Sequence, residues 1–469
     1  MTASAQSKAT ALTRVRHYGA SFGHLNGLFP GKYPRMFVRG EGTDLVDDDG
    51  HRVLDAGNHL GVCVAGHGRS DIADAVADQI RTMEFASLEA GASHPFVAAL
   101  ADQLAARVPV DNPIFSFVSS GSEANEVAIK LARDYHRRLG HRGRFKIMSR
   151  YGSYHGSTYA ATTATAIPGF REQFQPLVPG FVSLPQPFSG FCGRCSFNEP
   201  CVEHCIEETA AIIEREGPET VAAILAEPIS IPGAVKIPED GYWPKLRQLC
   251  DRYGILLIAD EVVTGFGRTG RLFGCEHWDV RPDIMTMAKG LTSGYIPMGA
   301  AAVSRRVQNA FEDTPLVHVN TYAGHPVACA AALATLKIVD DENLVGNAAA
   351  LEPELRAGLE AIRGQLPWPS RASVIGLLGS LEINLPADVD AERFRATVWH
   401  ESYEHGVAVR VTRSAQVVSV FFYPALVITA HRLQEGLGQL ATAVRRAVDM
   451  TLGHAPNSDP HLIHAGRTT

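Results

Sequence analysis

Between residues 114 and 288, short apolar runs alternate with stretches of helical periodicity, and this alternation is what most constrains the fold. Strands that alternate with helices predict a mostly parallel sheet covered by helices on both faces. Ligands bind such sheets beyond the carboxyl ends of the strands, so the residues after each run are candidates for a site. The runs are Ile114–Val118, Phe145–Met148, Val221–Leu225, Ile255–Ala259 and Ile284–Ala288.

The regions on either side of this series predict a second, smaller α+β domain. The N-terminal segment has the pattern of an antiparallel meander, and the C-terminal region mixes helices with short strands such as Val417–Phe422. We assign residues 1–70 and 336–453 to the small domain and residues 71–335 to the large domain. Residues 454–469 lack periodicity and are expected to form a flexible tail.

Composition excludes several classes of protein. The 469 residues are 45% hydrophobic and 20% charged, as in folded globular proteins, and the formal net charge of −7 argues against a nucleic-acid partner. No apolar run reaches the about 18 residues needed to span a membrane, and the polar N-terminus lacks the apolar core of a signal peptide. We therefore expect a cytoplasmic protein whose eight cysteines are reduced.

The segment after the first strand has the features of a phosphate site. Ser120 and Glu123 have the spacing of a capping box, and a helix with one apolar face follows. Gly121 lets a ligand approach the backbone, and free N–H groups at a helix start attract phosphate. We expect a phosphate group at Ser120, Gly121 and Ser122, the alternative being a capped helix without a ligand.

Charged residues end two of the later strands. Asp260 and Glu261 follow Ile255–Ala259, where an unpaired carboxylate would be costly, so such an acid needs a metal, a protonated ring nitrogen or a helix to cap. Lys289 follows Ile284–Ala288 directly. A lysine that is partly desolvated has a lowered pKa and can form a Schiff base with an aldehyde.

One ligand accounts for all three features. Pyridoxal phosphate carries a phosphate, a pyridine nitrogen that must stay protonated and an aldehyde that reacts with a lysine amine. We expect the helix start at Gly121 to hold the phosphate, Asp260 to hold the pyridinium and Lys289 to bind the aldehyde.

The order and spacing of several segments over roughly residues 35 to 440 resemble those of class III aminotransferases, which are fold type I pyridoxal-phosphate enzymes. The resemblance implies a large cofactor-binding domain, a small domain built from both chain ends, and a homodimer with sites at its interface. The segments are Ser120–Arg133, Tyr154–Gly156, Ala226–Pro228, Asp260–Gly270, Lys289–Gly290 and Asn320–Tyr322.

By position, the resemblance implies roles for four further residues. Tyr154 stacks on one face of the pyridine ring and Val262 packs on the other, while Glu227 belongs to the network around Asp260. Thr321 reaches the phosphate of the neighbouring subunit's cofactor. The alternatives are a core aromatic for Tyr154 and a surface turn for Thr321.

The reaction implied is transamination by a ping-pong mechanism. An amine or amino acid donates its amino group, and a keto acid, aldehyde or ketone accepts it, with Lys289 as general base and then general acid. Two alternatives stay open: another pyridoxal-phosphate reaction on the same fold (aminomutase, racemase or decarboxylase), or a non-enzymatic ligand- or metal-binding protein.

Two positions bear on the substrate. Gly61 lies where many amine-directed relatives carry a large aromatic, which indicates either more room or a backbone turn that needs glycine. Arg410 and Arg413 lie near the position of the family's carboxylate-binding arginine, and we favour Arg410. The family's Pro-Pro-Leu is altered here to Pro-Ala-Leu at Pro424–Leu426, with a few extra residues before it.

Four of the eight cysteines fall within an insertion at residues 185–205. Cys192 and Cys195 have the short spacing of thiolate metal sites, and Cys201 and Cys205 complete a possible set of four ligands. Such a set can hold structural zinc or an iron–sulfur cluster, with zinc preferred. The alternative is a reduced loop without metal.

Overall fold

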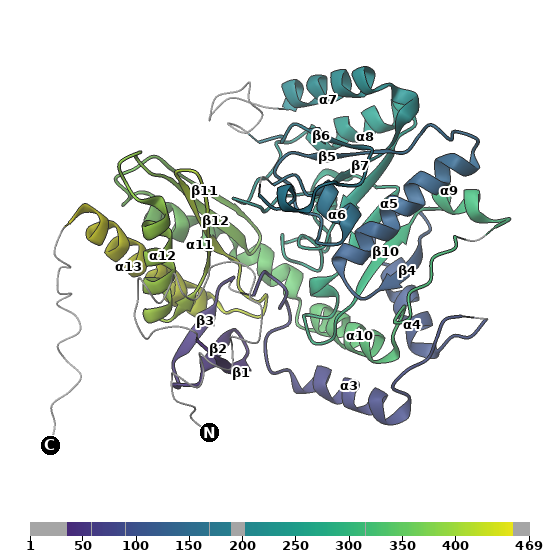
Figure 1. The fold of residues 1–469 in the computed structure, drawn as a ribbon. Helices are drawn as coiled ribbons and strands as arrows, with labels where there is room; N and C mark the ends of the chain where they lie inside the picture. Colours follow the sequence, from purple (N-terminus) through teal and green to yellow (C-terminus); the bar gives the residue numbers. More distant parts are fainter. Residues whose placement is uncertain are drawn as a thin grey trace.

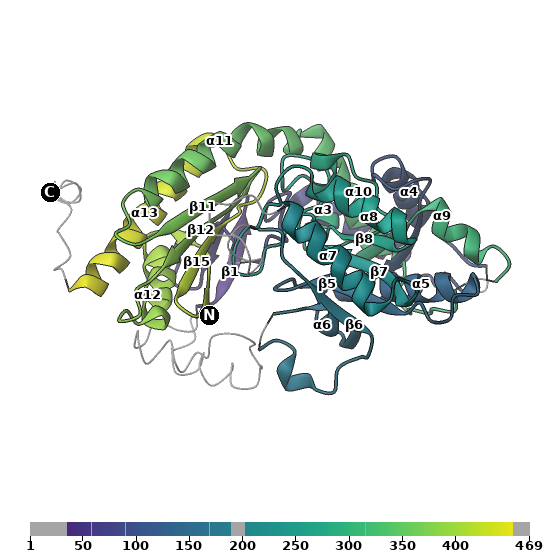
Figure 2. The ribbon, with the colours of Figure 1, turned by 90° about the horizontal axis from the view of Figure 1, so that it is seen from above.

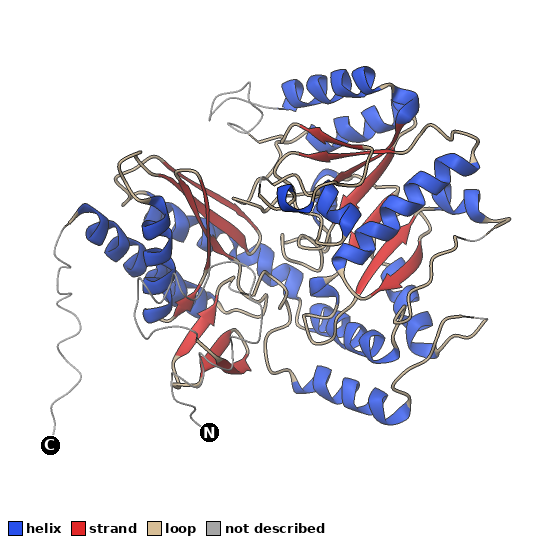
Figure 3. Ribbon diagram, in the orientation of Figure 1, coloured by secondary structure: helices blue, strands red, loops and turns tan. Residues whose placement is uncertain are grey.

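The computed structural model describes residues 35–57, 59–89, 91–167, 169–188, 202–314 and 316–453. Within these residues the chain forms a large domain around one sheet and a smaller domain around two further sheets, which lie beside it (Figures 1 and 2). Helices cover both faces of the large sheet, whereas those of the small domain gather on the outer side of its sheets (Figures 2 and 3).

The large sheet has seven strands in the described part of the chain, in the order β4-β10-β9-β8-β7-β5-β6. All neighbouring pairs are parallel except those of β10, which runs antiparallel to β4 and β9. The mostly parallel sheet is thus confirmed. In chain order the strands are β4 (Ile114–Val118), β5 (Lys146–Arg150), β6 (Phe181–Leu184), β7 (Val221–Ala226), β8 (Leu256–Asp260), β9 (Ile284–Met287) and β10 (Gly299–Val303).

Apolar side chains on both faces of this sheet bury it between helices. In β9, Ile284 packs in a cluster with α5, whereas Met285 and Met287 face the cluster with α4 and α10. Apolar residues on both faces explain why these strands show as short apolar runs in the sequence, with Thr286 the polar exception in β9. The helices are α3 (Ser70–Thr82), α4 (Pro95–Ala105), α5 (Gly121–Arg138), α6 (Tyr159–Ala164), α7 (Val202–Glu216), α8 (Tyr242–Tyr253), α9 (Arg305–Gln308) and α10 (Pro326–Asp341).

The small domain joins the two ends of the chain. Its first sheet has the order β1-β2-β3-β13, in which the C-terminal β13 pairs in parallel with the N-terminal β3. Its second sheet, β11-β12-β15-β14, is antiparallel. The elements are β1 (Phe37–Glu41), β2 (Asp44–Asp47), β3 (Arg52–Asp55), α11 (Leu344–Arg363), β11 (Ser370–Ile375), β12 (Leu378–Asn384), α12 (Ala391–Glu404), β13 (Val407–Ala408), β14 (Arg410–Ser414), β15 (Val417–Phe422) and α13 (Ala430–Leu452).

Short 3₁₀ helices complete the described structure at Glu172–Phe174, Pro218–Thr220, Gly274–Trp278, Lys289–Leu291 and Asn309–Phe311. Among the residues described, none of the helices combines the length and the apolar character required to cross a bilayer.

One buried guanidinium ties the two domains together. Arg268, in the loop after β8, is fully buried, and its Nη1 donates to the carbonyl of Leu377 at 3.2 Å and to that of Pro424. Its Nη2 donates to the carbonyl of Cys63 at 3.4 Å. Burial lowers the pKa of Arg268 to about 10. Arg268 thus connects the large domain to both segments that build the small one.

Arg268→Lys should reduce stability by about 2–4 kcal/mol, because an ammonium cannot reach carbonyls on three segments and a buried charge is left poorly paired. The midpoint of denaturant unfolding measures this. Arg81→Lys is the control, since Arg81 pairs with Asp78 on the surface, where a pair contributes about 0–1 kcal/mol. Equal midpoints for both variants would contradict this role.

Candidate active site

Lys289 lies two residues beyond the carboxyl end of β9, in a backbone conformation with φ +39°. Its side chain keeps some exposed surface, and Nζ forms no hydrogen bond or ion pair with any residue that the structure describes. Burial lowers the pKa of this amine to about 8; nearby Asp260 opposes the effect, while Arg410 and Arg268 add to it. A substantial neutral fraction is therefore present near pH 8, so the amine can act as a nucleophile or base.

Asp260 ends the neighbouring strand β8 and is held by three contacts. Oδ2 accepts from Asn125 Nδ2 at 2.8 Å and from His155 Nδ1 at 2.8 Å. Oδ1 accepts from the backbone N–H of Val262 at 3.1 Å. Only 4% of Asp260 is exposed, so the carboxylate is fixed in a dry setting where a cationic partner has its greatest effect.

Glu261, the second acid of the pair, has a structural role. It is fully buried, and its carboxylate accepts from the N–H groups of Gly274 and Cys275, both at 2.8 Å, at the start of the 3₁₀ helix Gly274–Trp278. The hydroxyl of Thr264 also donates to it. Glu261 therefore caps a helix, which is one of the alternatives that the sequence left open for these acids, whereas Asp260 faces the site.

Glu227, after β7, extends the network around Asp260. Its Oε1 accepts from the N–H of Tyr154 at 3.0 Å, and its Oε2 lies 3.3 Å from Arg150 Nη2 and 4.0 Å from His155 Nε2. The carboxylate of Glu227, the imidazole of His155 and the carboxylate of Asp260 form a buried series. His155 therefore lies between the carboxylates of Glu227 and Asp260.

Asn125, His155 and Arg150 have no role that the sequence alone predicts. Asn125 is a polar residue among the apolar, buried residues of α5, such as Ala124 and Val127. Its amide also accepts from Thr286 Oγ1 at 2.8 Å, which connects α5 to β9. A buried polar residue on such a face needs partners, and this requirement is the signal that points to Asn125.

The start of α5 lies against these strand ends. Ser120 Oγ accepts from the N–H of Glu123 at 3.2 Å, while Glu123 accepts from the N–H of Ser119 at 2.7 Å, one residue earlier than in a regular capping box. A Cβ on Gly121 would lie 2.9 Å from both methyl groups of Val262. Glycine is required there because α5 and the loop after β8 meet closely.

Tyr154 and Val262 both lie near Asp260, whose carboxylate acts on the pKa of Tyr154 and accepts from the N–H of Val262. Tyr154 is 41% exposed, and its ring meets that of Phe170 edge to face at 6.0 Å. It is therefore not the core aromatic that the sequence left as an alternative. Its exposed ring, the half-buried Val262, the amine and the carboxylate fit a flat, cationic aromatic ring that carries an aldehyde and a phosphate.

Arg410 and Arg413 occupy different settings. The guanidinium of Arg413 is exposed and pairs with Glu392 at 3.1 Å. Arg410 is half-buried, and its charge acts on the pKa values of Lys289, Tyr154 and Tyr423. Of the two arginines, Arg410 is the one near the amine.

Gly61 has φ +67°, which a glycine adopts without strain, and a Cβ there would lie 3.3 Å from Tyr423 Cδ2. The positive φ is consistent with the backbone alternative for this glycine, and the ring of Tyr423 lies beside it. Thr321 is exposed in a loop whose Asn320 donates to Glu123 at 3.4 Å, beside the start of α5.

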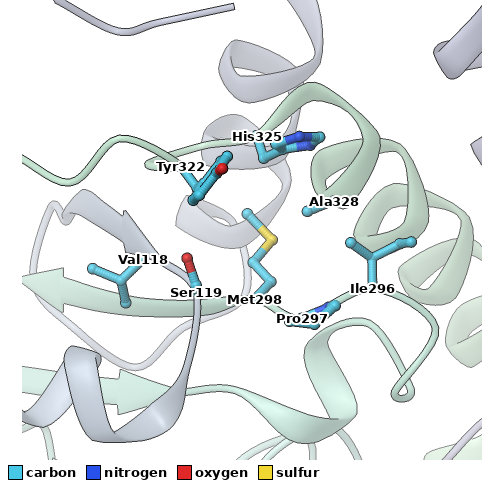
Figure 4. Close-up of a pocket in the computed structure, with 8 residues that line it drawn as sticks. All are labelled: Val118, Ser119, Ile296, Pro297, Met298, Tyr322, His325 and Ala328. Carbon is cyan, nitrogen blue, oxygen red and sulfur yellow. The ribbon is translucent and has the colours of Figure 1, made fainter. Parts of the chain in front are cut away.

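A cavity of about 220 Å³ lies beside that loop (Figure 4). The side chains of Tyr322 and His325 border it on one side, with Met298 and Ser119 opposite. Tyr322 is 58% exposed and contacts the exposed ring of Phe85 at 6.1 Å. The surface around this cavity is thus rich in exposed aromatic side chains.

Most of the cysteines predicted to bind a metal lie outside the residues that the structure describes. Cys192, Cys195 and Cys201 lie outside the described residues, whereas Cys205 is buried in α7, where its Sγ lies 3.7 Å from the carbonyl of Gln186. Within the described segments, no cluster of three or more His, Cys, Asp or Glu side chains is suited to a metal. The four-cysteine site stays a prediction.

A lysine and an aspartate at the carboxyl ends of neighbouring parallel strands, next to a helix start, are groups that suit pyridoxal phosphate. A sequence model described as aminotransferase class-III matches residues 30–444. The chain belongs to this family and is a pyridoxal-phosphate-dependent aminotransferase.

Named relatives agree with this class. The chain is 33% identical to a putrescine–pyruvate aminotransferase of Pseudomonas aeruginosa, over 90% of this chain and 91% of that one. It is 36% identical to an omega-amino acid–pyruvate aminotransferase of Pseudomonas putida, over 76% and 81%. The crystal structure of an (S)-enantioselective omega-transaminase from Thermomicrobium roseum matches with a TM-score of 0.88 and 36% identity, over 96% and 100%. Transamination is thus favoured over the other reactions considered.

The lowered pKa of Lys289 predicts how its reactivity depends on pH. Only the neutral amine reacts, so the rate of labelling of the apoenzyme by trinitrobenzenesulfonate should rise with pH through about 8 and flatten above it. Lys337 is exposed and its ion pair with Asp341 raises the pKa of its amine, so its reactivity should keep rising beyond the ordinary lysine value of about 10.4. Peptide mapping of label at each pH gives both curves. A midpoint for Lys289 equal to that of Lys337 would contradict the effect of burial.

Proposed function

We propose that this enzyme transfers the amino group of an amine or omega-amino acid to an α-keto acid, at a site built around Lys289 and Asp260. The observation that carries the proposal is the amine of Lys289, with its lowered pKa, beside a fixed carboxylate and a half-buried Arg410. The relatives named for putrescine or omega-amino acids with pyruvate support this substrate class.

The site residues divide the binding of the cofactor among them. Ser120, Gly121 and Ser122 offer helix-start N–H groups and hydroxyls to the phosphate. Asp260 keeps the ring nitrogen protonated, while Tyr154 and Val262 cover the two faces of the ring. Bound pyridoxal phosphate supplies an electron sink for the negative charge that develops on the substrate carbon.

Two further groups act on Asp260 and on the substrate. His155 donates to Asp260 and lies near Glu227, so the three together keep a fixed negative charge directed at the ring nitrogen. Lys289 Nζ accepts the proton from the substrate carbon and later returns one, as general base and then general acid. A pKa near the working pH suits both directions of transfer.

Arg410 is proposed to bind the substrate carboxylate. A guanidinium recognises a carboxylate through two parallel hydrogen bonds, which fix the orientation of a keto acid or an omega-amino acid. The position of Arg410 near Lys289, and the pairing of Arg413 with Glu392, support the choice of Arg410.

Lys289→Ala should lower the rate of amino transfer by about 10⁴-fold or more, because the general base is removed. In the wild-type holoenzyme, borohydride should attach the cofactor to the peptide that contains Lys289. Asp260→Asn should still bind cofactor but react about 10²-fold more slowly, since a neutral amide does not hold a pyridinium. Label on another lysine, or wild-type rates in Asp260→Asn, would overturn the assignment.

A homodimer is also proposed, in which Thr321 reaches the partner's cofactor phosphate. Exposed apolar side chains near Thr321 support it: Phe85, Val317, Val319 and Tyr322 are 40–87% exposed. A patch of this kind marks an interaction surface. A cytoplasmic location is proposed as well, supported by four buried cysteines that form no disulfide, Cys63, Cys250, Cys275 and Cys329.

Sedimentation should give a dimer, and Thr321→Ala should lose pyridoxal phosphate faster on dialysis, because one phosphate contact is removed. Thr442→Ala is the matched control, since the hydroxyl of Thr442 donates to the carbonyl of Gly438 within α13. A fully active monomer, or equal loss of cofactor from both variants, would refute the proposed role of Thr321.

A further inference from the structure

The ring of Tyr423 rests on two glycines of the N-terminal segment. Tyr423 follows β15, is 4% exposed, and its N–H donates to the carbonyl of Ala56 at 3.0 Å. A Cβ on Gly57 would lie 3.1 Å from Cε2 and Cζ of this ring, and one on Gly61 would lie 3.3 Å from Cδ2. Both glycines have positive φ values, +130° and +67°. A side chain at either position would therefore meet both backbone strain and the tyrosine ring.

This contact limits the space that the absence of a side chain at Gly61 leaves for a substrate. Beyond the tyrosine ring, the nearest group to a Cβ on Gly61 would be Val263 Cγ1 at 3.9 Å, one residue after Val262, which flanks the proposed ring site. Gly61 is thus close to the pocket, but the space that an aromatic at this position would fill is already taken in part by Tyr423. The bulky side chain beside Gly61 is thus that of Tyr423, which follows β15.

The same strand end supports Arg410. Arg410 lies directly opposite Phe421 in the antiparallel pair β14–β15, and its Cζ is 5.5 Å from the centroid of that ring. Alternate residues of a strand share a face, and the rings of Phe421 and Tyr423 meet at 5.9 Å. An arginine above an aromatic face is held by cation–π attraction. Arg410 therefore lies over the buried ring of Phe421, which in turn contacts the ring of Tyr423.

Charge connects Tyr423, Arg410 and Lys289. Burial raises the pKa of the Tyr423 hydroxyl, and Arg410 acts against this rise, as a cation near a phenol does. Arg410 also lowers the pKa of Lys289. The guanidinium is thus near both the hydroxyl of Tyr423 and the reactive amine.

We propose that Tyr423 is a specificity-determining residue of this enzyme: its ring closes the pocket over Gly57 and Gly61, and its hydroxyl, together with the ring of Phe421, directs Arg410 toward the substrate. The pocket then favours compact substrates that carry a carboxylate over bulky amines without one. The inference rests on the proposed function, because it assigns a substrate class to the same site.

The effect of the ring is tested with two amines that differ only in bulk, 1-phenylethylamine and 1-phenylbutylamine. In Tyr423→Ala and Tyr423→Leu holoenzyme, the ratio of kcat/KM for the larger amine to that for the smaller should rise about tenfold, since removing the ring makes room for two methylene groups. Two variants are used so that one poorly folded protein does not decide the result. An unchanged ratio in the folded variants overturns this part of the proposal.

The effect on Arg410 is tested with β-alanine and propylamine, which differ by a carboxylate in place of a methyl group. In Tyr423→Phe, KM for β-alanine should rise about three- to tenfold while kcat and the values for propylamine stay within about twofold. Tyr403→Phe is the matched control, because it removes the hydroxyl of a buried small-domain tyrosine that donates to Asp47. Equal shifts for both amines, or the same shift in Tyr403→Phe, overturn the positioning role.

A binding measurement separates this inference from the proposed function. Propionate carries the carboxylate but no amine, so calorimetric titration of holoenzyme needs no turnover. Wild-type protein should bind propionate about three- to tenfold more tightly than Tyr423→Phe. If wild-type enzyme uses none of the amines but this difference persists, the proposed function fails and the role of Tyr423 stands. If amines react but the difference is absent, the role of Tyr423 fails alone.

Discussion

A carboxylate buried at the end of a parallel strand is the constraint on which the site depends. Asp260 is 4% exposed, and an ionised group in such a place must be paired and hydrogen-bonded. Asn125 from α5, His155 after β5 and the N–H of Val262 meet this need. These hydrogen bonds hold the start of α5 and the loops after β5 and β8 against the carboxylate of Asp260. The arrangement of the proposed phosphate, ring and amine positions follows from this.

The sequence predicted the sheet well where strands are long, apolar and buried on both faces. It missed β10, whose residues Gly299–Val303 are glycine, alanine and one valine, because small side chains give a weak strand signal. The structure shows why small residues suit this strand: β10 lies antiparallel between β4 and β9, and a Cβ on Gly299 would lie 2.3 Å from the carbonyl oxygen of Ser120. Long-range close packing of this kind leaves no periodic pattern in a sequence.

Within the site, the sequence singled out residues that follow strands directly, such as Asp260 and Lys289. It could not separate Asp260 from Glu261, because both end the same strand and only the fold shows that Glu261 caps a 3₁₀ helix. It also gave no role to His155 or Tyr423. Their functions depend on neighbours more than 100 residues away along the chain, Asp260 and Gly61 respectively.

The two domains contribute different parts of the chemistry. The groups proposed to hold the cofactor come from the strand ends of the large domain, whereas Arg410 and Tyr423 come from β14 and the end of β15 in the small domain. Arg268 bonds the carbonyl of Pro424, the residue next to Tyr423, from the loop that begins at Asp260. The strand end that carries Tyr423 is therefore bonded to the loop that follows Asp260, the carboxylate proposed to hold the ring nitrogen. A direct hydrogen bond thus joins the segment proposed to select the substrate to the large domain, although the two parts lie far apart in the sequence.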